Sequence, residues 1–189
     1  MKYQSIVFSG LPGAGKSTLV AKLQEIYGWR LLSIGDIFRR RWIEKYPDRK
    51  MSFEDYWRQV ADEEIVKLNV EARDAFSKKN IIGDSRYTIY LRDLPIFLVF
   101  MSADIDVRAT RAFGLEKYGG KSIEEIKTIL ARREGDEMAV ARKLFGYDYR
   151  ESHYYDLVIN SGRLTVEEEV AVIQGVIQNG DISRNQVNL

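Results

Sequence analysis

The chain has 189 residues, of which 45% are apolar and 30% charged, and its formal net charge is +1. This size and balance predict one globular domain with a sizeable core, and the near-neutral charge offers no bulk basicity for nucleic acid or membrane surfaces. The absence of cysteine excludes disulfides and cysteine-ligated metal sites, and a lone histidine, His153, disfavours a histidine-built metal centre.

No segment predicts membrane insertion or export. The longest apolar stretch covers residues 96–101, whereas a membrane-spanning helix needs about 20 apolar residues. The glycine-rich residues 10–16 interrupt the apolar run at the N-terminus, so a signal-peptide pattern is absent. We therefore expect a cytoplasmic protein with neither a membrane nor a nucleic-acid partner.

Short apolar segments alternate with helical patterns along the chain. The predicted strands cover residues 5–8, 29–34, 80–85, 94–102 and 155–161. The predicted helices cover residues 16–28, 35–46, 52–76, 103–113, 122–145 and 165–178, and a polar tail follows at 179–189. Such alternation predicts an α/β fold with a mostly parallel sheet that is covered on both faces.

Residues 114–148 stand out because they are highly charged and lie where a short crossover between the fourth and fifth strands would suffice. Residues 116–122 are expected to form a loop, and Ser122 would begin the long helix. Two interpretations stay open, a mobile flap over a site or a solvated helical hairpin.

The stretch FSGLPGAGKSTL at residues 8–19 fits the pattern G-x-x-x-x-G-K-[ST], with a strand before it and a helix after it. Glycines permit positive φ and let backbone N–H groups converge, and the helix start adds unpaired N–H groups and the positive end of its dipole. Lys16 supplies a point charge for the outer phosphates, and Ser17 supplies a hydroxyl for Mg²⁺. A chance glycine turn is the alternative to a nucleoside triphosphate site. The predicted phosphate-binding residues are Gly10, Gly13, Ala14, Gly15, Lys16, Ser17 and Thr18.

Ligands in open α/β sheets bind beyond the carboxyl ends of the strands, so the residues that follow each strand are candidates. Ser33, Asp36 and Arg39 follow the second predicted strand, and Asp84 and Arg86 follow the third. Arg39 and Arg86 are expected to converge on the site, where two guanidinium groups suit a phosphate dianion. The other interpretation of Arg39 and its neighbours is a solvated basic helix face.

Phosphate-binding loops of this kind serve switches, motors and kinases of small acceptors. A guanine-nucleotide switch needs an Asn-Lys-x-Asp-type segment, and the nearest stretch, INSGR at 159–163, does not fit. A motor is usually longer than this chain. A kinase is therefore favoured.

Five stretches of the sequence carry a resemblance to a known family. They are GLPGAGKSTL, LLSIGDIFRR, ADIDVRATR, the run from RRE to GYDY, and YYDLVINSGRLTVEEEV. The chain resembles the nucleoside monophosphate kinases, and most of all their cytidylate kinase-like branch. This resemblance implies a P-loop NTPase of three α/β/α layers around a five-stranded parallel sheet. It also implies a monomer that transfers a phosphoryl group from Mg·ATP to CMP or dCMP.

The resemblance further implies one kinase domain over 1–189. Its core would cover 1–35, 78–113 and 150–180, with a nucleoside monophosphate-binding arm at about 36–77 and a lid at about 114–149. Arg39 matches the arginine that holds the acceptor phosphate. Arg86 matches the arginine after the third strand, although GDSR stands here in place of an E-G-R-like setting. Ser33 and Asp36 fall where the family approaches the acceptor nucleotide.

The resemblance also assigns the lid. Arg133 matches an arginine that closes on the transferring phosphate, and Arg142 or Arg111 would join it. The implied catalytic residues are Lys16, Arg86 and Arg133, with Mg²⁺ held by Ser17 and, through water, by Asp84. Arg133 has a second interpretation, because it lies four residues from Glu137 and the two can form a surface helix pair.

Two rival functions remain. The first is a small-molecule hydroxyl kinase that resembles shikimate or gluconate kinases, in which Asp36 would be a general base and the arginines would bind a carboxylate. The second is a regulatory nucleotide-binding P-loop protein with little transfer activity. Met138 and Val140 motivate it, because they stand where the family carries further lid arginines.

Overall fold

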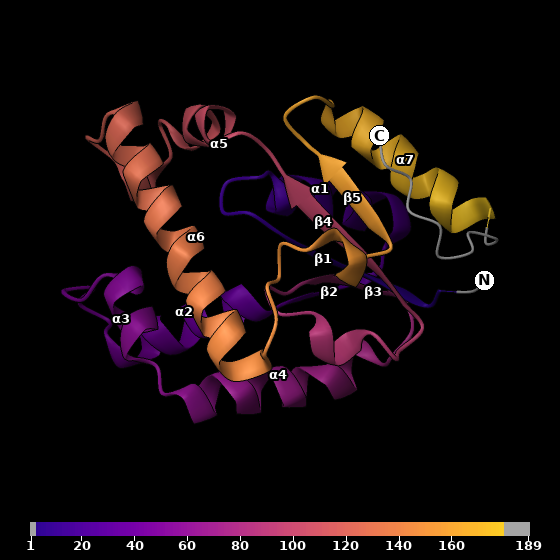
Figure 1. The fold of residues 1–189 in the computed structure, drawn as a ribbon, viewed down its shortest axis with the longest axis horizontal. Coiled ribbons are helices and arrows are strands. Elements are labelled where there is room, and N and C mark those ends of the chain that lie inside the picture. Colours follow the sequence, from indigo (N-terminus) through magenta and orange to yellow (C-terminus); the bar gives the residue numbers. More distant parts are fainter. Residues whose placement is uncertain (1–2, 180–189) are drawn as a thin grey trace.

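The computed structural model describes residues 3–179, so the predicted tail lies outside the described residues from 180 on. Five parallel strands form one sheet in the order β2-β3-β1-β4-β5 (Figure 1). The strands are β1 (Ser5–Gly10), β2 (Arg30–Ser33), β3 (Ile81–Asp84), β4 (Ile96–Ser102) and β5 (Leu157–Asn160). The helices are α1 (Lys16–Tyr27), α2 (Ile34–Lys45), α3 (Phe53–Gln59), α4 (Asp62–Phe76), α5 (Ile105–Ala112), α6 (Ile123–Phe145) and α7 (Val166–Asn179). The predicted parallel α/β fold is confirmed.

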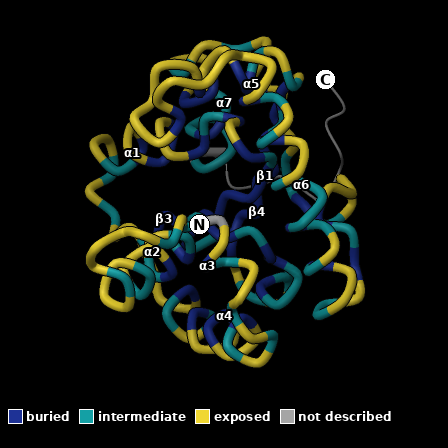
Figure 2. Tube along the Cα trace, turned by 90° about the vertical axis from the view of Figure 1, so that its left-hand side faces the viewer, coloured by how far each residue is buried: buried dark blue, intermediate teal, exposed yellow. Residues whose placement is uncertain are grey.

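Side chains of the central strand β1 alternate between the two faces of the sheet. Ile6 and Phe8 belong to a buried cluster with residues of α1 and α7, whereas Val7 belongs to a cluster with residues of α2, α4 and α6. Figure 2 shows β1 and β4 as buried strands in the middle of the molecule, between helices with exposed outer faces. The sheet is thus covered on both sides. Within residues 3–179, no helix combines the length and apolar character needed to cross a membrane.

Strand register brings the carboxyl ends of the strands to one edge of the sheet. Asp84 pairs with Phe8 on one side and with Ser33 on the other, and Gly10 pairs with Met101. Helix α6 passes this edge on the side toward which the arrows of β4 and β5 point (Figure 1). It begins at a capping box in which Ser122 and Glu125 bond each other's backbone N–H groups. The charged segment between β4 and β5 is therefore mainly one long helix.

One helix predicted from the sequence is wrong. The segment 52–76 is not a single helix, because the chain is extended at Val60 and Ala61 between α3 and α4. Helix α3 packs against α2, where the Trp57 ring meets Phe38 edge-on at 4.8 Å, whereas α4 packs on the sheet. One straight helix cannot follow both surfaces. Three acidic residues at 62–64 favour the new start at α4.

Gly10→Ala is expected to destabilise the fold by about 3 kcal/mol or more. Gly10 has a φ of 141°, and a Cβ there would lie 2.1 Å from the backbone oxygen of Met101. The matched control is Gly28→Ala, where φ is 63° and a Cβ would meet nothing within 4 Å. That variant should lose only about 1 kcal/mol. Urea unfolding of both variants measures the difference, and equal losses would contradict a steric clash at Gly10.

Candidate active site

The loop between β1 and α1 has the geometry of an anion-binding turn. Gly13 and Gly15 adopt φ values of 82° and 88°, and Gly15 is the N-cap of α1 without a side-chain hydrogen bond. The first-turn N–H groups of α1 therefore lack a side-chain cap, and Ser17 and Thr18 are exposed beside them. Ala14 is buried, and its carbonyl accepts a hydrogen bond from Ser161 Oγ at 2.8 Å. The loop is thus anchored to the protein interior at Ala14, and its helix end at Ser17 and Thr18 is open to solvent.

The Lys16 side chain is buried within this loop. Its Nζ donates to the carbonyl oxygens of Gly10 at 3.0 Å and Leu11 at 3.1 Å. Burial, followed by the charge of Arg86, lowers the pKa of Lys16 to about 7, although Asp84 and Glu137 act in the opposite direction. A bound anion would raise the pKa of such a buried amine, because a nearby negative charge stabilises its charged form.

A cavity of about 420 Å³ opens between the sheet edge, α2, α3 and α6. Four of the site residues predicted from the sequence line this cavity together. They are Arg39 of α2, Asp84 at the end of β3, Arg86 just after β3, and Arg133 of α6. Phe38, Phe53 and Trp57 form its apolar side. Its other lining residues include Lys117, Tyr118, Arg132, Asp136 and Glu137. The structure therefore brings the predicted arginines to one hollow.

Ser33 and Asp36 do not line this cavity. The Ser33 hydroxyl caps α2 by accepting a hydrogen bond from the Asp36 N–H at 3.2 Å. The Asp36 carboxylate pairs with Arg39 one turn later, and both side chains are about half exposed. The Arg39 guanidinium also lies 5.6 Å from the centre of the Phe53 ring. Both Ser33 and Asp36 thus have local partners in the helix.

Arg86 is held between a carboxylate and an aromatic ring. Its Nε lies 2.9 Å from Glu137 Oε2, and its guanidinium lies 5.6 Å from the Tyr149 ring centre. Burial is the largest single influence and lowers the pKa of Arg86, but the Glu137 carboxylate, together with Asp84 and the neighbouring tyrosines, outweighs it, so the net shift is upward. On α6, Arg133 Nε donates to Glu137 Oε1 at 3.0 Å. The predicted i,i+4 pair of Arg133 and Glu137 is confirmed, but Glu137 is buried and also reaches Arg86.

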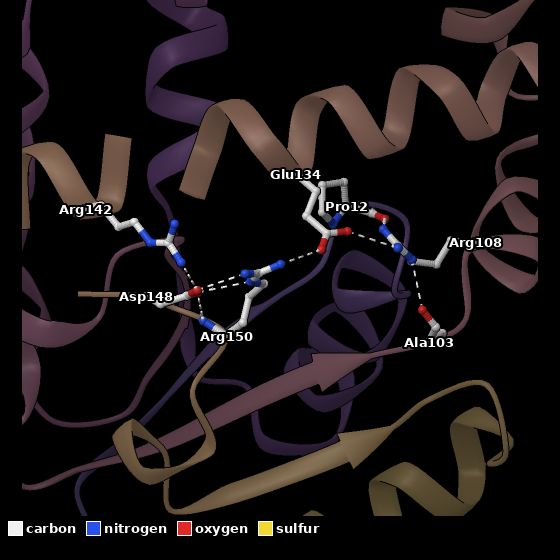
Figure 3. A network of polar contacts seen from close by, with 7 residues as sticks. All are labelled: Pro12, Ala103, Arg108, Glu134, Arg142, Asp148 and Arg150. Carbon is white, nitrogen blue, oxygen red and sulfur yellow. Dashed lines mark hydrogen bonds and ion pairs between the residues drawn. The ribbon is translucent and has the colours of Figure 1, made fainter. Parts of the chain in front are cut away.

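Arg142 does not reach the cavity. Its guanidinium is exposed and pairs with Asp148 at 3.1 Å (Figure 3). The Arg150 side chain is hydrogen-bonded to the same carboxylate, and these bonds lower the pKa of Asp148 to about 2. A substrate-binding role for Arg142 stays a prediction. Arg111 likewise has protein partners, since it donates to the Ser161 carbonyl at 2.6 Å.

Arg108 is a buried residue beside the phosphate-binding loop. It is buried on α5 and donates to the carbonyl oxygens of Ala103 at 2.9 Å and Pro12 at 3.1 Å, and to Glu134 of α6 at 3.0 Å (Figure 3). It thus ties the phosphate-binding loop to α6. The one sequence signal is its place in ADIDVRATR, one helical turn after Asp104.

Comparisons with known proteins agree with this geometry. A model of the AAA domain family matches residues 9–118, more than half of the chain. The cytidylate kinase of Thermoplasma acidophilum is 30% identical over 164 residues, which cover 82% of each chain. The cytidylate kinase of Archaeoglobus fulgidus is 29% identical over 185 residues, covering 96% of this chain and 98% of its own. Shikimate kinase from Acinetobacter baumannii has a TM-score of 0.59 at 15% identity over 96% of both chains, which shows a shared fold alone.

Proposed function

The chain carries an AAA-family P-loop domain and belongs to the cytidylate kinase-like nucleoside monophosphate kinases, and on that premise we propose that it transfers the γ-phosphoryl group of ATP to CMP or dCMP. The products would be ADP and the nucleoside diphosphate. One observation carries the proposal: Arg86 and Arg133 share the carboxylate of Glu137 at a cavity beside Lys16. Cations for the donor and acceptor phosphates are therefore close together.

Each cation has a distinct part in the proposed transfer. The loop N–H groups and Lys16 hold the β- and γ-phosphates, and Arg39 and Arg86 hold the acceptor phosphate in line. Arg133 neutralises the charge that spreads over the transferring group. Since a phosphate acceptor is already anionic, no general base is needed, and the pairing of Asp36 with Arg39 favours this acceptor over a hydroxyl.

We assign residues 36–77, which carry α2 to α4, to the acceptor arm and residues 114–149, which carry α6, to the lid. Two ion pairs join them, Arg58 of α3 with Asp136 of α6 at 3.2 Å, and Lys143 of α6 with Asp62 of α4. Movement of α6 against the arm would exclude water and so limit ATP hydrolysis.

The aromatic side of the cavity suits the acceptor base. Of Trp42, Tyr46 and Trp57 in the arm, Trp57 lines the cavity. Trp42 instead donates its indole N–H to the Met51 carbonyl at 3.0 Å, and Tyr46 packs against Tyr56. A pyrimidine would therefore lie against Trp57.

The residues present also fit Mg²⁺. Ser17 offers an exposed hydroxyl in the first turn of α1, and Asp84 offers a carboxylate at the cavity. Among residues 3–179, no group of three or more histidine or acidic side chains could hold a metal ion. That suits an ion bound mainly by phosphate oxygens and water, which is usual for Mg²⁺. When bound, it would offset charge on the phosphates.

ATP binding is expected to take up a proton. With a pKa of about 7, only about a tenth of Lys16 is charged at pH 8 in the free protein. Phosphate oxygens raise that pKa, so binding at pH 8 should take up close to one proton and binding at pH 6 very little. Calorimetry in buffers of different ionisation enthalpy measures the uptake. Lys16→Met should abolish it, and equal uptake by both proteins would contradict a lowered pKa.

A coupled assay of ADP release tests the function. The protein is supplied with Mg·ATP and, in turn, CMP, dCMP, UMP, AMP, GMP, dTMP, shikimate and gluconate. We expect release that depends on CMP or dCMP. Release only with shikimate or gluconate would select a hydroxyl acceptor, and tight ATP binding without any release would select a nucleotide-binding protein.

A further inference from the structure

Glu137 is a buried carboxylate between two arginines, and the reaction described so far gives it no part. It lies in the middle of α6 and is only 5% exposed. Its Oε1 accepts from Arg133 Nε at 3.0 Å, and its Oε2 lies 2.9 Å from Arg86 Nε. Arg86 follows β3, whereas Arg133 belongs to α6, so one carboxylate links the sheet edge to the lid helix.

Both arginines approach this carboxylate with Nε, the inner nitrogen of the guanidinium group. Arg133 does so through a hydrogen bond, and Arg86 through an ion pair that lacks hydrogen-bond geometry. Nη1 of Arg86 is buried and has no hydrogen-bond partner within residues 3–179. The outer nitrogens of Arg133 likewise have no partner among the described residues, and both side chains line the cavity. A buried guanidinium nitrogen without an acceptor is costly, and phosphate oxygens would satisfy it.

The surrounding contacts hold this arrangement in place. Arg86 packs on Tyr149, and its carbonyl accepts a hydrogen bond from Ser9 Oγ at 2.9 Å. The backbone carbonyl of Glu137 accepts from the Tyr87 hydroxyl at 3.4 Å. Without the Glu137 carboxylate, the positive charges of Arg86, Arg133 and Lys16 would repel one another with less negative charge nearby to offset them. Asp84 is the other anion that acts on Lys16.

We propose that Glu137 is a positioning residue that holds Arg86 and Arg133 by Nε, so that their outer nitrogens point toward adjoining phosphate groups. The inference rests on the proposed function for the identity of those groups, which are the acceptor phosphate at Arg86 and the transferring group at Arg133. Glu137 does not touch substrate in this account. It fixes the angle and separation of two guanidinium groups before the substrates arrive, which lowers the ordering cost of the transition state.

Glu137→Gln keeps the size of the side chain and removes its charge. We expect kcat to fall by about 10²-fold, as for other small misplacements of reacting groups, while KM for ATP stays within about twofold because the phosphate-binding loop is untouched. Glu124→Gln on the same helix is the control, since Glu124 is exposed and, among residues 3–179, its carboxylate pairs only with Lys127. An unchanged or higher kcat in Glu137→Gln would overturn the proposal and make the carboxylate a competitor of phosphate.

Double-mutant analysis separates positioning from mere stability. In an Arg133→Ala background, adding Glu137→Gln should lower kcat by less than about threefold further, because the effects of residues that act as a unit are not additive. A full additional 10²-fold loss would overturn the proposal. If Glu137→Gln does not fold, Glu137→Asp keeps the charge but withdraws the carboxylate, and it should show the same loss of kcat.

Binding of inorganic phosphate gives a readout that does not depend on the acceptor. Followed by ³¹P line broadening, it should weaken about tenfold in Glu137→Gln. A wild-type protein that transfers to no nucleotide, but binds phosphate more tightly than Glu137→Gln, would refute the proposed function and keep this inference. Normal transfer with equal phosphate binding and equal kcat in both proteins would do the reverse.

Discussion

Replacing Lys16 by alanine should lower kcat for phosphoryl transfer by about 10³-fold, which is the upper range for losing one preorganised charge at a reacting group. The fold should survive. The lowered pKa of Lys16 means that burial disfavours its charged form, so the ammonium adds little to stability. Lys16 donates two hydrogen bonds, to the carbonyl oxygens of Gly10 and Leu11, and their loss should cost little stability compared with what the buried apolar residues of β1 contribute.

The control for Lys16→Ala is Lys22→Ala. Lys22 lies on the same helix, is about half exposed and pairs with Glu25 at 3.1 Å. It should leave kcat unchanged. Circular dichroism and thermal unfolding of both variants check the fold. Loss of folded structure in Lys16→Ala would assign the lysine a structural role and contradict its part in the reaction.

Replacing Arg133 by alanine should lower kcat by about 10³-fold or more, as expected for an arginine that stabilises a transferring phosphoryl group. Arg133 reaches the cavity from α6 and is braced by Glu137. Its loss should therefore appear in kcat, with KM for ATP nearly constant. Arg133→Lys keeps the charge without the planar fork, and it should recover only part of the rate. Steady-state kinetics against Mg·ATP and CMP measures each variant.

Arg142→Ala tests the same helix nine residues later. Its guanidinium is exposed and pairs with Asp148 outside the cavity, so we expect nearly wild-type kcat. A rise in KM for the acceptor would give Arg142 the substrate-binding role predicted from the sequence. Equal losses of kcat in Arg133→Ala and Arg142→Ala would mean that the total charge of the lid, rather than the position of Arg133, carries the effect.

Much of this architecture could be predicted because local signals agreed with the fold. The apolar runs marked every strand, and the glycine pattern marked the turn from β1 into α1. Parallel strands bring their carboxyl ends to one edge, so Asp84 and Arg86 could be placed near the loop without knowing the contacts. Gly28 ends α1 in a left-handed conformation, which agrees with the predicted helix end at residue 28.

The remaining features depended on packing between distant segments. The break between α3 and α4 carries no proline or glycine, and it follows from two helices meeting different surfaces. Glu137 had the spacing of a solvated helix pair, and only its burial against Arg86 gives it another meaning. The bond from Arg108 to the Pro12 carbonyl joins segments 96 residues apart. Hydrophobic periodicity says nothing about such polar contacts.

The most direct test of the account is transfer of label from [γ-³²P]ATP to CMP. Chromatography then separates labelled nucleoside diphosphate from labelled inorganic phosphate, so that transfer is distinguished from hydrolysis. If the protein is this kinase, the label appears in CDP, and Lys16→Ala and Arg133→Ala each slow its appearance by about 10³-fold. Label that is released only as inorganic phosphate, or that stays in ATP with every monophosphate offered, would contradict it.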